Sequence, residues 1–264
     1  MEFKEILKKL SVLNYDNGRN FTVRDRLDSV TELLRDTKYK KINSEGLFEM
    51  YAQNGVLPEN PVLVSTHIDC ASSLTHCFSE EYRDEYLRGT FDNLITNAAA
   101  VYLMTEQRLN ENVVIVFTGD EECDSRGAID VAVFLKSRER DFKAVILDVT
   151  DMGWDRNAYF SVENNFWSEG FGKKVVNICG SSGNEWCFVP SDLDEIPGYI
   201  PKDKLINEEA LCDESWEYDE NDIECFSLCI PVSGDMHDNS GVLVRKASID
   251  SYINILAAVL NGMD

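Results

Sequence analysis

Three short apolar runs, each followed at once by histidine or carboxylate side chains, constrain this chain more than any other feature. The runs lie in PVLVSTHID, NVVIVFTGDEE and KAVILDVTD. Runs of this length that are rich in valine and isoleucine are typical of strands buried on both faces, as in the parallel sheets of α/β proteins. Open α/β sheets commonly carry ligand sites beyond the carboxyl ends of their strands. The chain is therefore predicted to fold around a buried sheet whose carboxyl edge holds its chemistry.

Helical patterns lie between these runs, where they would cover the sheet. The opening residues MEFKEILKKL and a second stretch behind Thr22, a candidate N-cap, place apolar side chains at helical spacing. The further expected elements are helices at 22–36, 92–109, 125–137 and in SIDSYINILAAVL, with strands at 38–43, 46–53 and in CFSLCIPV. This alternation predicts an α/β fold with a central mixed, mostly parallel β-sheet flanked by helices.

Length and composition indicate a single catalytic domain that spans residues 1–264. Hydrophobic residues make up 44% of the chain, and no Pro-, Gly- or Ser-rich linker or internal repeat divides it. One segment differs, because residues 185–224 hold 14 acidic and 2 basic side chains with several Trp and Tyr residues between them. Its aromatic residues either line a substrate pocket or pack the segment against itself, and we favour the second interpretation.

The charge balance disfavours two classes of partner. The chain has 25 basic and 48 acidic residues, a net charge of 25 − 48 = −23 at pH 7. Such a surface repels nucleic-acid phosphates and anionic membrane headgroups.

The first residues lack the apolar core of a signal peptide, no transmembrane run occurs, and the eight cysteines form no CxxC pair. We expect a cytoplasmic protein with reduced thiols and no nucleic-acid or membrane partner, and we leave homo-oligomer formation open.

Two of the three histidines, His67 and His237, lie beside carboxylates in loops that follow apolar strands. A core histidine is not expected there, but a single histidine of this kind is more often a surface residue than a metal ligand. In THID, residues i and i+2 of a strand point to the same face. Asp69 can therefore accept a hydrogen bond from His67 and orient its other nitrogen toward a metal. The alternative is that Asp69 caps a turn.

The GDEE run places three acidic side chains after a buried strand. This costs electrostatic free energy unless a cation neutralises them or water solvates them. Adjacent side chains point in different directions, so we assign Glu122 as a metal ligand and Glu121 as the general base that acts on a water. A solvated acidic turn explains the run equally well when the run is considered alone.

Two aspartates occupy positions where a carboxylate needs a partner. Asp148 follows the apolar run AVIL at the expected end of a core strand, where an unpaired carboxylate is costly. Asp92 in GTFDN is expected at a helix start, and a helix cap is the stronger interpretation of that residue alone. A carboxylate that bridges two metals at a helix start would satisfy both roles.

The order H-x-D, DN, EE, D and H, spread over most of the chain, resembles the zinc exopeptidase superfamily, which includes leucyl and glutamyl aminopeptidases and the aminoacylases. The fragments STHIDC, TGDEECDSRGA and AVILDVTD look most like the glutamyl aminopeptidase branch. The resemblance implies that Asp69 orients His67, that Asp92 bridges two metal ions and that Glu121 is the base. The metal ligands that it implies are His67, Asp92, Glu122, Asp148 and His237.

Spacing separates this chain from parts of that superfamily. Only 92 − 67 = 25 positions lead from His67 to Asp92, too few for the accessory domain that the glutamyl branch inserts there. The interval of 26 that follows Glu122 leaves no room for the lid domain of the aminoacylases, so the chain looks more like the single-domain leucyl aminopeptidases. Asn97 replaces a usual Gly and Asp238 a common Ser, and both changes concern the substrate pocket more than the metals.

The implied activity is hydrolysis of a peptide or small amide bond, in the first place as an aminopeptidase. Mixed histidine and carboxylate ligands suit zinc, and cobalt or manganese fits nearly as well. An amidohydrolase of N-acyl amino acids or dipeptides would use the same metals, and a catalytically silent metal-binding or interaction protein would keep the same scaffold. His76, Cys70, Cys77 and Cys123 lie near the ligands in sequence but are not expected to bind metal, because the ligand set is already complete.

Overall fold

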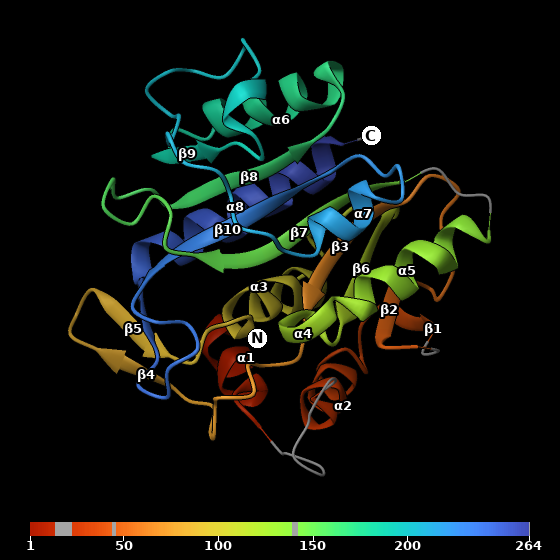
Figure 1. Ribbon diagram of the computed structural model, residues 1–264. Helices are drawn as coiled ribbons and strands as arrows, with labels where there is room; N and C mark the ends of the chain where they lie inside the picture. Colours follow the sequence, from red (N-terminus) through yellow and green to blue (C-terminus); the bar gives the residue numbers. More distant parts are fainter. Residues whose placement is uncertain (14–22, 44–45, 139–141, 264) are drawn as a thin grey trace.

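The computed structural model describes residues 1–13, 23–43, 46–138 and 142–263 and places a β-sheet between two layers of helices (Figure 1). The helices are α1 (Phe3–Leu10), α2 (Arg24–Leu33), α3 (Leu94–Thr105), α4 (Glu121–Asp124), α5 (Arg126–Lys136), α6 (Glu169–Ser181), α7 (Ser215–Asp219) and α8 (Lys246–Gly262), with a 3₁₀ turn at Leu193–Glu195. None of these helices is both long and apolar enough to cross a membrane. The strands are β1 (Tyr39–Asn43), β2 (Phe48–Gln53), β3 (Val62–His67), β4 (Ser79–Tyr82), β5 (Tyr86–Gly89), β6 (Val113–Thr118), β7 (Lys143–Thr150), β8 (Phe160–Phe166), β9 (Trp186–Val189), β10 (Cys225–Ser233) and β11 (Val242–Arg245).

The sheet runs in the order β1-β2-β6-β3-β7-β10-β11-β5-β4, and β8 and β9 extend from β10. Its centre is parallel, because β6, β3, β7 and β10 are neighbours that run in the same direction. Antiparallel pairs flank this centre on both sides. The three apolar runs of the sequence are β3, β6 and β7. The predicted α/β fold with a mixed sheet flanked by helices is therefore confirmed, with its main parallel pairs gathered at the centre.

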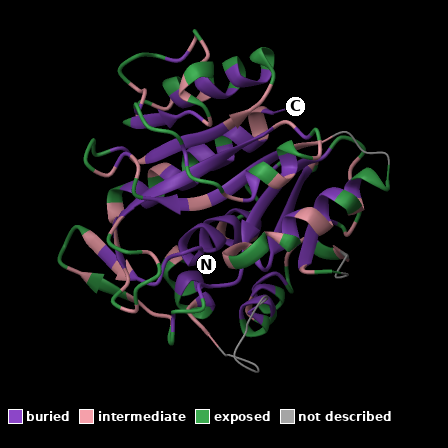
Figure 2. Cartoon of the chain, in the orientation of Figure 1, coloured by how far each residue is buried: buried purple, intermediate pink, exposed green. Residues whose placement is uncertain are grey.

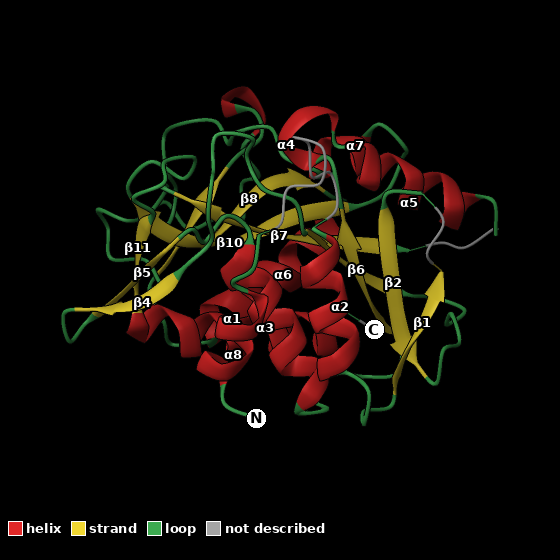
Figure 3. Ribbon diagram, turned by 90° about the horizontal axis from the view of Figure 1, so that it is seen from below, coloured by secondary structure: helices red, strands yellow, loops and turns green. Residues whose placement is uncertain are grey.

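Helices cover both faces of the sheet (Figure 3). On one face, α1, α2, α3, α6 and α8 share a continuous apolar core with the central strands. On the other face, α5 and α7 pack over alternate residues of the same strands. Along β3, for example, Val62 and Val64 face the first layer and Leu63 faces the second. Because both faces are covered, these strands are unbroken apolar runs in the sequence.

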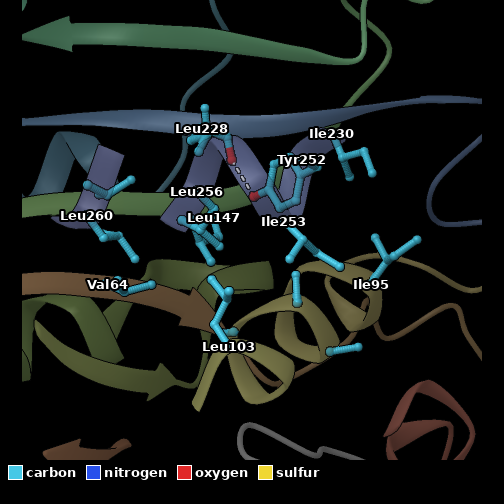
Figure 4. Close-up of a cluster of buried hydrophobic side chains, with 14 of the residues drawn as sticks. Val64, Ile95, Leu103, Leu147, Leu228, Ile230, Tyr252, Ile253, Leu256 and Leu260 are labelled. Carbon is cyan, nitrogen blue, oxygen red and sulfur yellow. Dashed lines mark hydrogen bonds between the residues drawn. The ribbon is translucent and has the colours of Figure 1, made fainter. Parts of the chain in front are cut away.

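A cluster of aliphatic side chains packs α3 and α8 against the central strands (Figure 4). Leu147 and Leu228 come from β7 and β10, and Leu103 and Leu256 come from the two helices. The hydroxyl of Tyr252 donates a 2.7 Å hydrogen bond to the carbonyl of Leu228, which satisfies a polar group within this apolar layer. The buried residues of this layer form one continuous zone beneath the exposed outer loops (Figure 2).

The sequence does not predict β4, β5, β8, β9, β11 or α6. β4 and β5 consist of SEEY and YLRG, whose residues are only partly buried, so neither shows an apolar run. The predicted cap Thr22 lies outside the described residues. Helix α3 begins at Leu94 with Asn93, not Asp92, at its N-cap position, and no side-chain hydrogen bond caps it. Helix capping therefore does not explain Asp92.

The acidic segment at 185–224 contains β9, the 3₁₀ turn and α7, joined by loops. Trp186 stacks on Phe160 with ring centroids 6.3 Å apart, and Trp216 meets Phe166 edge-on at 5.2 Å. Both partners belong to β8. The tryptophans of the segment therefore pack on the sheet and not on one another.

Candidate metal centre

The ends of three neighbouring strands bring most of the candidate residues together. His67 is the last residue of β3, Glu121 and Glu122 begin α4 directly after β6, and Asp148 lies near the end of β7. Because β3 is paired in parallel with β6 on one side and with β7 on the other, these ends meet at one edge. The acidic pair begins a short helix and not an extended loop, and Asp120 before it turns the chain with a left-handed φ of 67°.

Two further loops supply the remaining residues. Asp92 lies between β5 and α3, and His237 lies between β10 and β11. Asn239 fixes the second loop, because its amide oxygen accepts a 2.7 Å hydrogen bond from the backbone N–H of Thr75. Its amide nitrogen donates a 2.9 Å hydrogen bond to the carbonyl of Ser73. All five predicted ligands therefore lie at the same edge of the sheet, although the chain spreads them from residue 67 to residue 237.

Asp92 connects two groups of side chains. Its Oδ1 lies 3.1 Å from Nε2 of His67, and its Oδ2 lies 3.4 Å from Nε2 of His237. Asp148 completes the first group, 3.7 Å from Nε2 of His67, and Glu122 completes the second, 3.3 Å from Nε2 of His237. Within each group, the candidate ligand atoms lie within 4.8 Å of one another. A carboxylate with one oxygen in each of two such groups has the position of a bridging ligand.

Glu121 lies beside the first group. Its Oε2 is 3.9 Å from Nε2 of His67. The side chain of Glu121 is 16% exposed, whereas the side chain of His67 is 2% exposed. It also forms a third candidate ligand group with His67 and Glu122. Glu121 is thus close to the predicted ligands and still open to solvent, as a group that exchanges protons with a water must be.

Asp69 and Asn97 hold the residues around His67 in place. Oδ1 of Asp69 lies 3.4 Å from Nδ1 of His67, close enough for charge attraction although not aligned as a hydrogen bond. Oδ2 of Asp69 accepts a 3.3 Å hydrogen bond from the backbone N–H of Glu122. Asn97 donates 2.8 Å hydrogen bonds to the carbonyls of His67 and Asn93. Asn97 therefore connects the end of β3 to the start of α3.

The centre contains more carboxylates than histidines, and most of them are buried. Burial, followed by the charge of Asp92, raises the pKa of Glu122 to about 7, and burial raises the pKa of Asp148 to about 6. Burial would lower the pKa of His67, but the surrounding carboxylates, Glu121 first, outweigh it and raise that pKa well above its usual value. Proton uptake relieves part of the electrostatic repulsion between these carboxylates, and divalent cations would relieve more of it.

The residues of this centre fit divalent metal ions. Oε1 of Glu122 is buried and has no hydrogen-bond partner in the described part of the chain, as expected of an atom that a metal would satisfy. The charged contacts of the five predicted ligands are with one another, with Asp69 and with Glu121, and no described lysine or arginine forms an ion pair with them. Nitrogen and oxygen donors of this kind suit zinc, cobalt or manganese.

Two carboxylates behind the centre, one buried and one partly buried, are not among the residues selected from the sequence. Glu214 is 1% exposed and accepts a 2.8 Å hydrogen bond from the hydroxyl of Ser65 on β3. Asp213 accepts hydrogen bonds from Ser215 and contributes to the raised pKa of Asp148. Both come from the acidic segment, where many neighbouring acids conceal any single position. The available signal is Ser65, a hydroxyl that directly follows the apolar run of β3.

Known proteins were compared with the chain by sequence and by structure. No protein-family profile matches the sequence, and no curated protein matches it. A TET aminopeptidase from the marine sediment archaeon Thaumarchaeota archaeon SCGC AB-539-E09 has a TM-score of 0.75 and 10% identity, covering 99% of this chain and 96% of that one. The aminopeptidase APDkam598 from the archaeon Desulfurococcus kamchatkensis has a TM-score of 0.71 and 12% identity, covering 98% and 94%. The chain has the fold of these aminopeptidases.

The same fold extends to a bacterial enzyme. The LapA aminopeptidase of Legionella pneumophila has a TM-score of 0.66 and 10% identity, covering 99% of this chain and 70% of that one. The fold that the sequence motifs imply is therefore confirmed, since the chain shares it with these aminopeptidases. The roles of the individual residues remain predictions.

Proposed function

We propose that this protein is a two-metal aminopeptidase that removes residues from the amino terminus of peptides. One observation carries the proposal: the two oxygens of Asp92 face two different histidines, His67 and His237, and each histidine has a further carboxylate beside it. The fold shared with aminopeptidases of known structure supports the same reaction.

The two groups joined by Asp92 would hold the two ions. His67, Asp92 and Asp148 are the candidate ligands of one ion, and Asp92, Glu122 and His237 are those of the other. Bound divalent ions of this kind lower the pKa of a water and polarise a carbonyl group. Zinc is our first choice of metal, with cobalt and manganese as alternatives, because the donor set is mixed histidine and carboxylate.

Glu121 would move the proton. Burial raises the pKa of Glu121 well above its usual value; the charge of His67 opposes the shift, and the charge of Asp148 adds to it. A carboxylate with a raised pKa can take a proton from the attacking water and later give it to the amine that leaves. Asp69 is proposed as a positioning residue, because it lies against His67 and holds the backbone of Glu122.

A free amino group fits this centre better than an N-acylated amino acid does. The charged neighbours that most affect Glu121, Glu122 and Asp148 are histidines and other carboxylates, with no lysine or arginine among them. An N-acyl amino acid needs a basic group for its carboxylate, whereas a peptide amino terminus needs acidic neighbours. The acidic surroundings therefore favour an aminopeptidase over a deacylase.

The test compares Glu121→Gln with the wild type after metal removal and reloading with zinc, cobalt or manganese. We expect metal-dependent release of amino acids from peptides and aminoacyl anilides. We expect kcat to fall about 100-fold or more in Glu121→Gln, since general-base catalysis typically contributes about 10²–10⁴-fold. Asp124→Asn is the matched control, because Asp124 is exposed on the same short helix and should leave kcat unchanged.

Four results would contradict the proposal. They are the absence of stoichiometric metal binding, full activity in Glu121→Gln, cleavage restricted to N-acyl amino acids, and metal binding without hydrolysis of any substrate in the panel. The third result would identify the same centre as that of an amidohydrolase. The fourth would identify a catalytically silent metal-binding protein.

The proposal includes a location and an assembly. PhTET1-12s, a solved structure with a TM-score of 0.68 and 12% identity, is described as a dodecamer, so we propose that this chain also forms homo-oligomers. Sedimentation of the purified protein tests this, because a single chain has a mass of 30.0 kDa.

We also propose a cytoplasmic protein without nucleic-acid or membrane partners, in keeping with its charge of −23, and fractionation of cells tests this location.

A further inference from the structure

Arg26, on α2, is a buried cation whose contacts within the described residues include no carboxylate. Its side chain is 0% exposed, and its guanidinium donates hydrogen bonds to the carbonyls of Val12 at 3.1 Å and Ile68 at 3.0 Å. The third contact is a 2.8 Å hydrogen bond from Nη2 to Sγ of Cys77. Within the described ranges, no carboxylate lies at ion-pair distance from Arg26. A guanidinium keeps its proton, and a buried charge needs a counter-charge, so the sulfur of Cys77 is the contact able to supply one.

Cys77 forms a pair with Cys70. Neither is in a disulfide, and Cys77 packs against a small apolar cluster that contains Cys70. Interaction with the Cys70 thiol and the charge of Arg26 lower the pKa of Cys77 to about 5, although burial opposes the shift. Interaction with the Cys77 thiol and burial raise the pKa of Cys70 well above its usual value. The two shifts have opposite directions, so the pair favours a thiolate at Cys77 and a protonated thiol at Cys70.

Three other cysteines differ from Cys77, because the pKa of each of their thiols is raised. Burial raises the pKa of Cys179 and of Cys187 to about 12, and no arginine hydrogen-bonds either sulfur among the described contacts. Cys212 is exposed, and its pKa is raised by partial burial and nearby carboxylates. The arrangement at Cys77 is therefore not shared by these three cysteines and does not follow from burial alone.

The segment between the two cysteines touches both sides of the candidate metal centre. Cys70 directly follows Asp69, which lies against His67. Inside the segment, the hydroxyl of Ser73 donates a 2.7 Å hydrogen bond to the carbonyl of His237. A chemical change at the pair would therefore act on a segment that supports both histidines.

We propose that Cys77 and Cys70 are a redox-active dithiol that hydroperoxides oxidise to a disulfide. The Cys77 thiolate attacks a peroxide oxygen, an S–O bond forms, the O–O bond breaks, and the hydroxide that leaves takes a proton from solvent. The Cys70 sulfur then attacks the Cys77 sulfenic acid, an S–S bond forms, and the S–O bond breaks. The thiol proton leaves with the oxygen as water. In total, two thiols lose two electrons, and one hydrogen peroxide becomes two waters.

The oxidised state would have lower aminopeptidase activity, a consequence that rests on the function proposed above. Disulfide formation removes the anionic partner of Arg26 and cross-links the segment that holds the His237 loop. Reduction by a dithiol would restore the anionic partner of Arg26 and remove the cross-link from the segment. The thiol chemistry itself does not depend on the hydrolytic reaction, so the two can be measured separately.

The first experiment measures thiol reactivity in the full-length folded protein. Iodoacetamide at pH 6 is expected to label Cys77 at least about ten times faster than the exposed Cys212, because the thiolate is the reacting form. Stoichiometric hydrogen peroxide is expected to join Cys70 to Cys77, detected by peptide mass spectrometry as the loss of two hydrogens and reversed by dithiothreitol. No variant is needed for either measurement.

Cysteine-to-serine variants show which cysteine takes part in each oxidation step. Cys70→Ser should stop the reaction at a Cys77 sulfenic acid that dimedone traps, Cys77→Ser should give neither product, and Cys212→Ser should oxidise like the wild type. Labelling of Cys77 no faster than Cys212, or no Cys70–Cys77 disulfide in the folded protein under peroxide, would overturn the proposal. If the disulfide forms in a protein without peptidase activity, the thiol site stands and only the proposed function fails.

Discussion

Asp69 lies two residues beyond His67, with its carboxylate between the imidazole and the backbone of Glu122. Asp69→Asn keeps an oxygen that can accept from Glu122 but removes the charge that orients His67. We expect metal affinity or kcat to fall by about 10–100-fold without loss of the fold. Chelator competition and steady-state kinetics measure the two effects, with Asp124→Asn as the control. Wild-type affinity and kcat in Asp69→Asn would remove Asp69 from the centre.

Glu163, on β8, is a second residue whose behaviour depends on its surroundings. It is 5% exposed, accepts a 2.5 Å hydrogen bond from Ser161, and has a pKa that burial raises to about 8. In the unfolded chain, a glutamate has a pKa near ~4.3. The folded state therefore binds the proton more tightly, and stability falls as the pH rises from about 4.5 to 8.

Glu163→Gln removes this contribution to the pH dependence. We expect the stability of the variant relative to the wild type to increase between pH 5 and pH 8, by up to about 1.4 kcal/mol per pH unit. Urea unfolding of both proteins at several pH values measures the difference, and other titrating groups cancel in the comparison. Identical pH dependence in the two proteins would show that Glu163 ionises normally.

At the scale of elements, Gly127 determines how closely α5 approaches the strands that carry the acidic pair. A Cβ there would lie 2.6 Å from the backbone N and O of Gly119 and 2.7 Å from the carbonyl oxygen of Leu47. These atoms are also hydrogen-bonded, since Gly119 N–H donates to Leu47 and Gly127 N–H donates to Gly119. The SRGA motif thus has a physical reason: only glycine permits this contact beside the Glu121-Glu122 turn.

Gly127→Ala should force these backbones apart. We expect a loss of about 1–3 kcal/mol in the free energy of unfolding, together with reduced activity because the acidic pair moves. Gly180→Ala in α6 is the matched control, since nothing lies within 4 Å of its Cβ position and alanine favours helix. Denaturant unfolding of both variants is the measurement, and equal stability of the two would contradict the steric argument.

Prediction of the elements succeeds where burial produces a pattern. Strands buried on both faces, such as β3, β6 and β7, are continuous apolar runs and are recognised directly. The hairpin of β4 and β5 is only partly buried, and its charged residues give no such run. The sequence analysis expects no helix at Glu121 and Glu122, which begin a four-residue helix after Asp120 turns the chain in a left-handed conformation.

At the scale of the whole molecule, metal binding and folding should be coupled. The predicted ligands come from three strand ends and two distant loops, so the unfolded chain cannot bind the ions in the same way. Zinc at about 100 times its dissociation constant should add about 2.7 kcal/mol to the stability of the metal-free protein. For a chain of this size, the melting temperature should rise by on the order of 5–10 °C.

Asp92→Asn provides the control for this coupling. Because Asp92 connects both ligand groups, its variant should show a clearly smaller rise in melting temperature with zinc. Differential scanning calorimetry of the chelated protein with and without zinc measures both shifts. An equal shift in the two proteins would mean that zinc binds elsewhere.

The apolar runs of the sequence predict the fold class and the region of the candidate site. Apolar runs that end in polar residues are typical of buried parallel strands, and the carboxyl ends of such strands meet at one edge. The sequence does not predict which side chains face one another, because that depends on the folded chain. The bridging position of Asp92, the buried Glu214 behind β3 and the contact between Arg26 and Cys77 join segments far apart in the chain. Their distances depend on strand order and loop path, which local patterns do not encode.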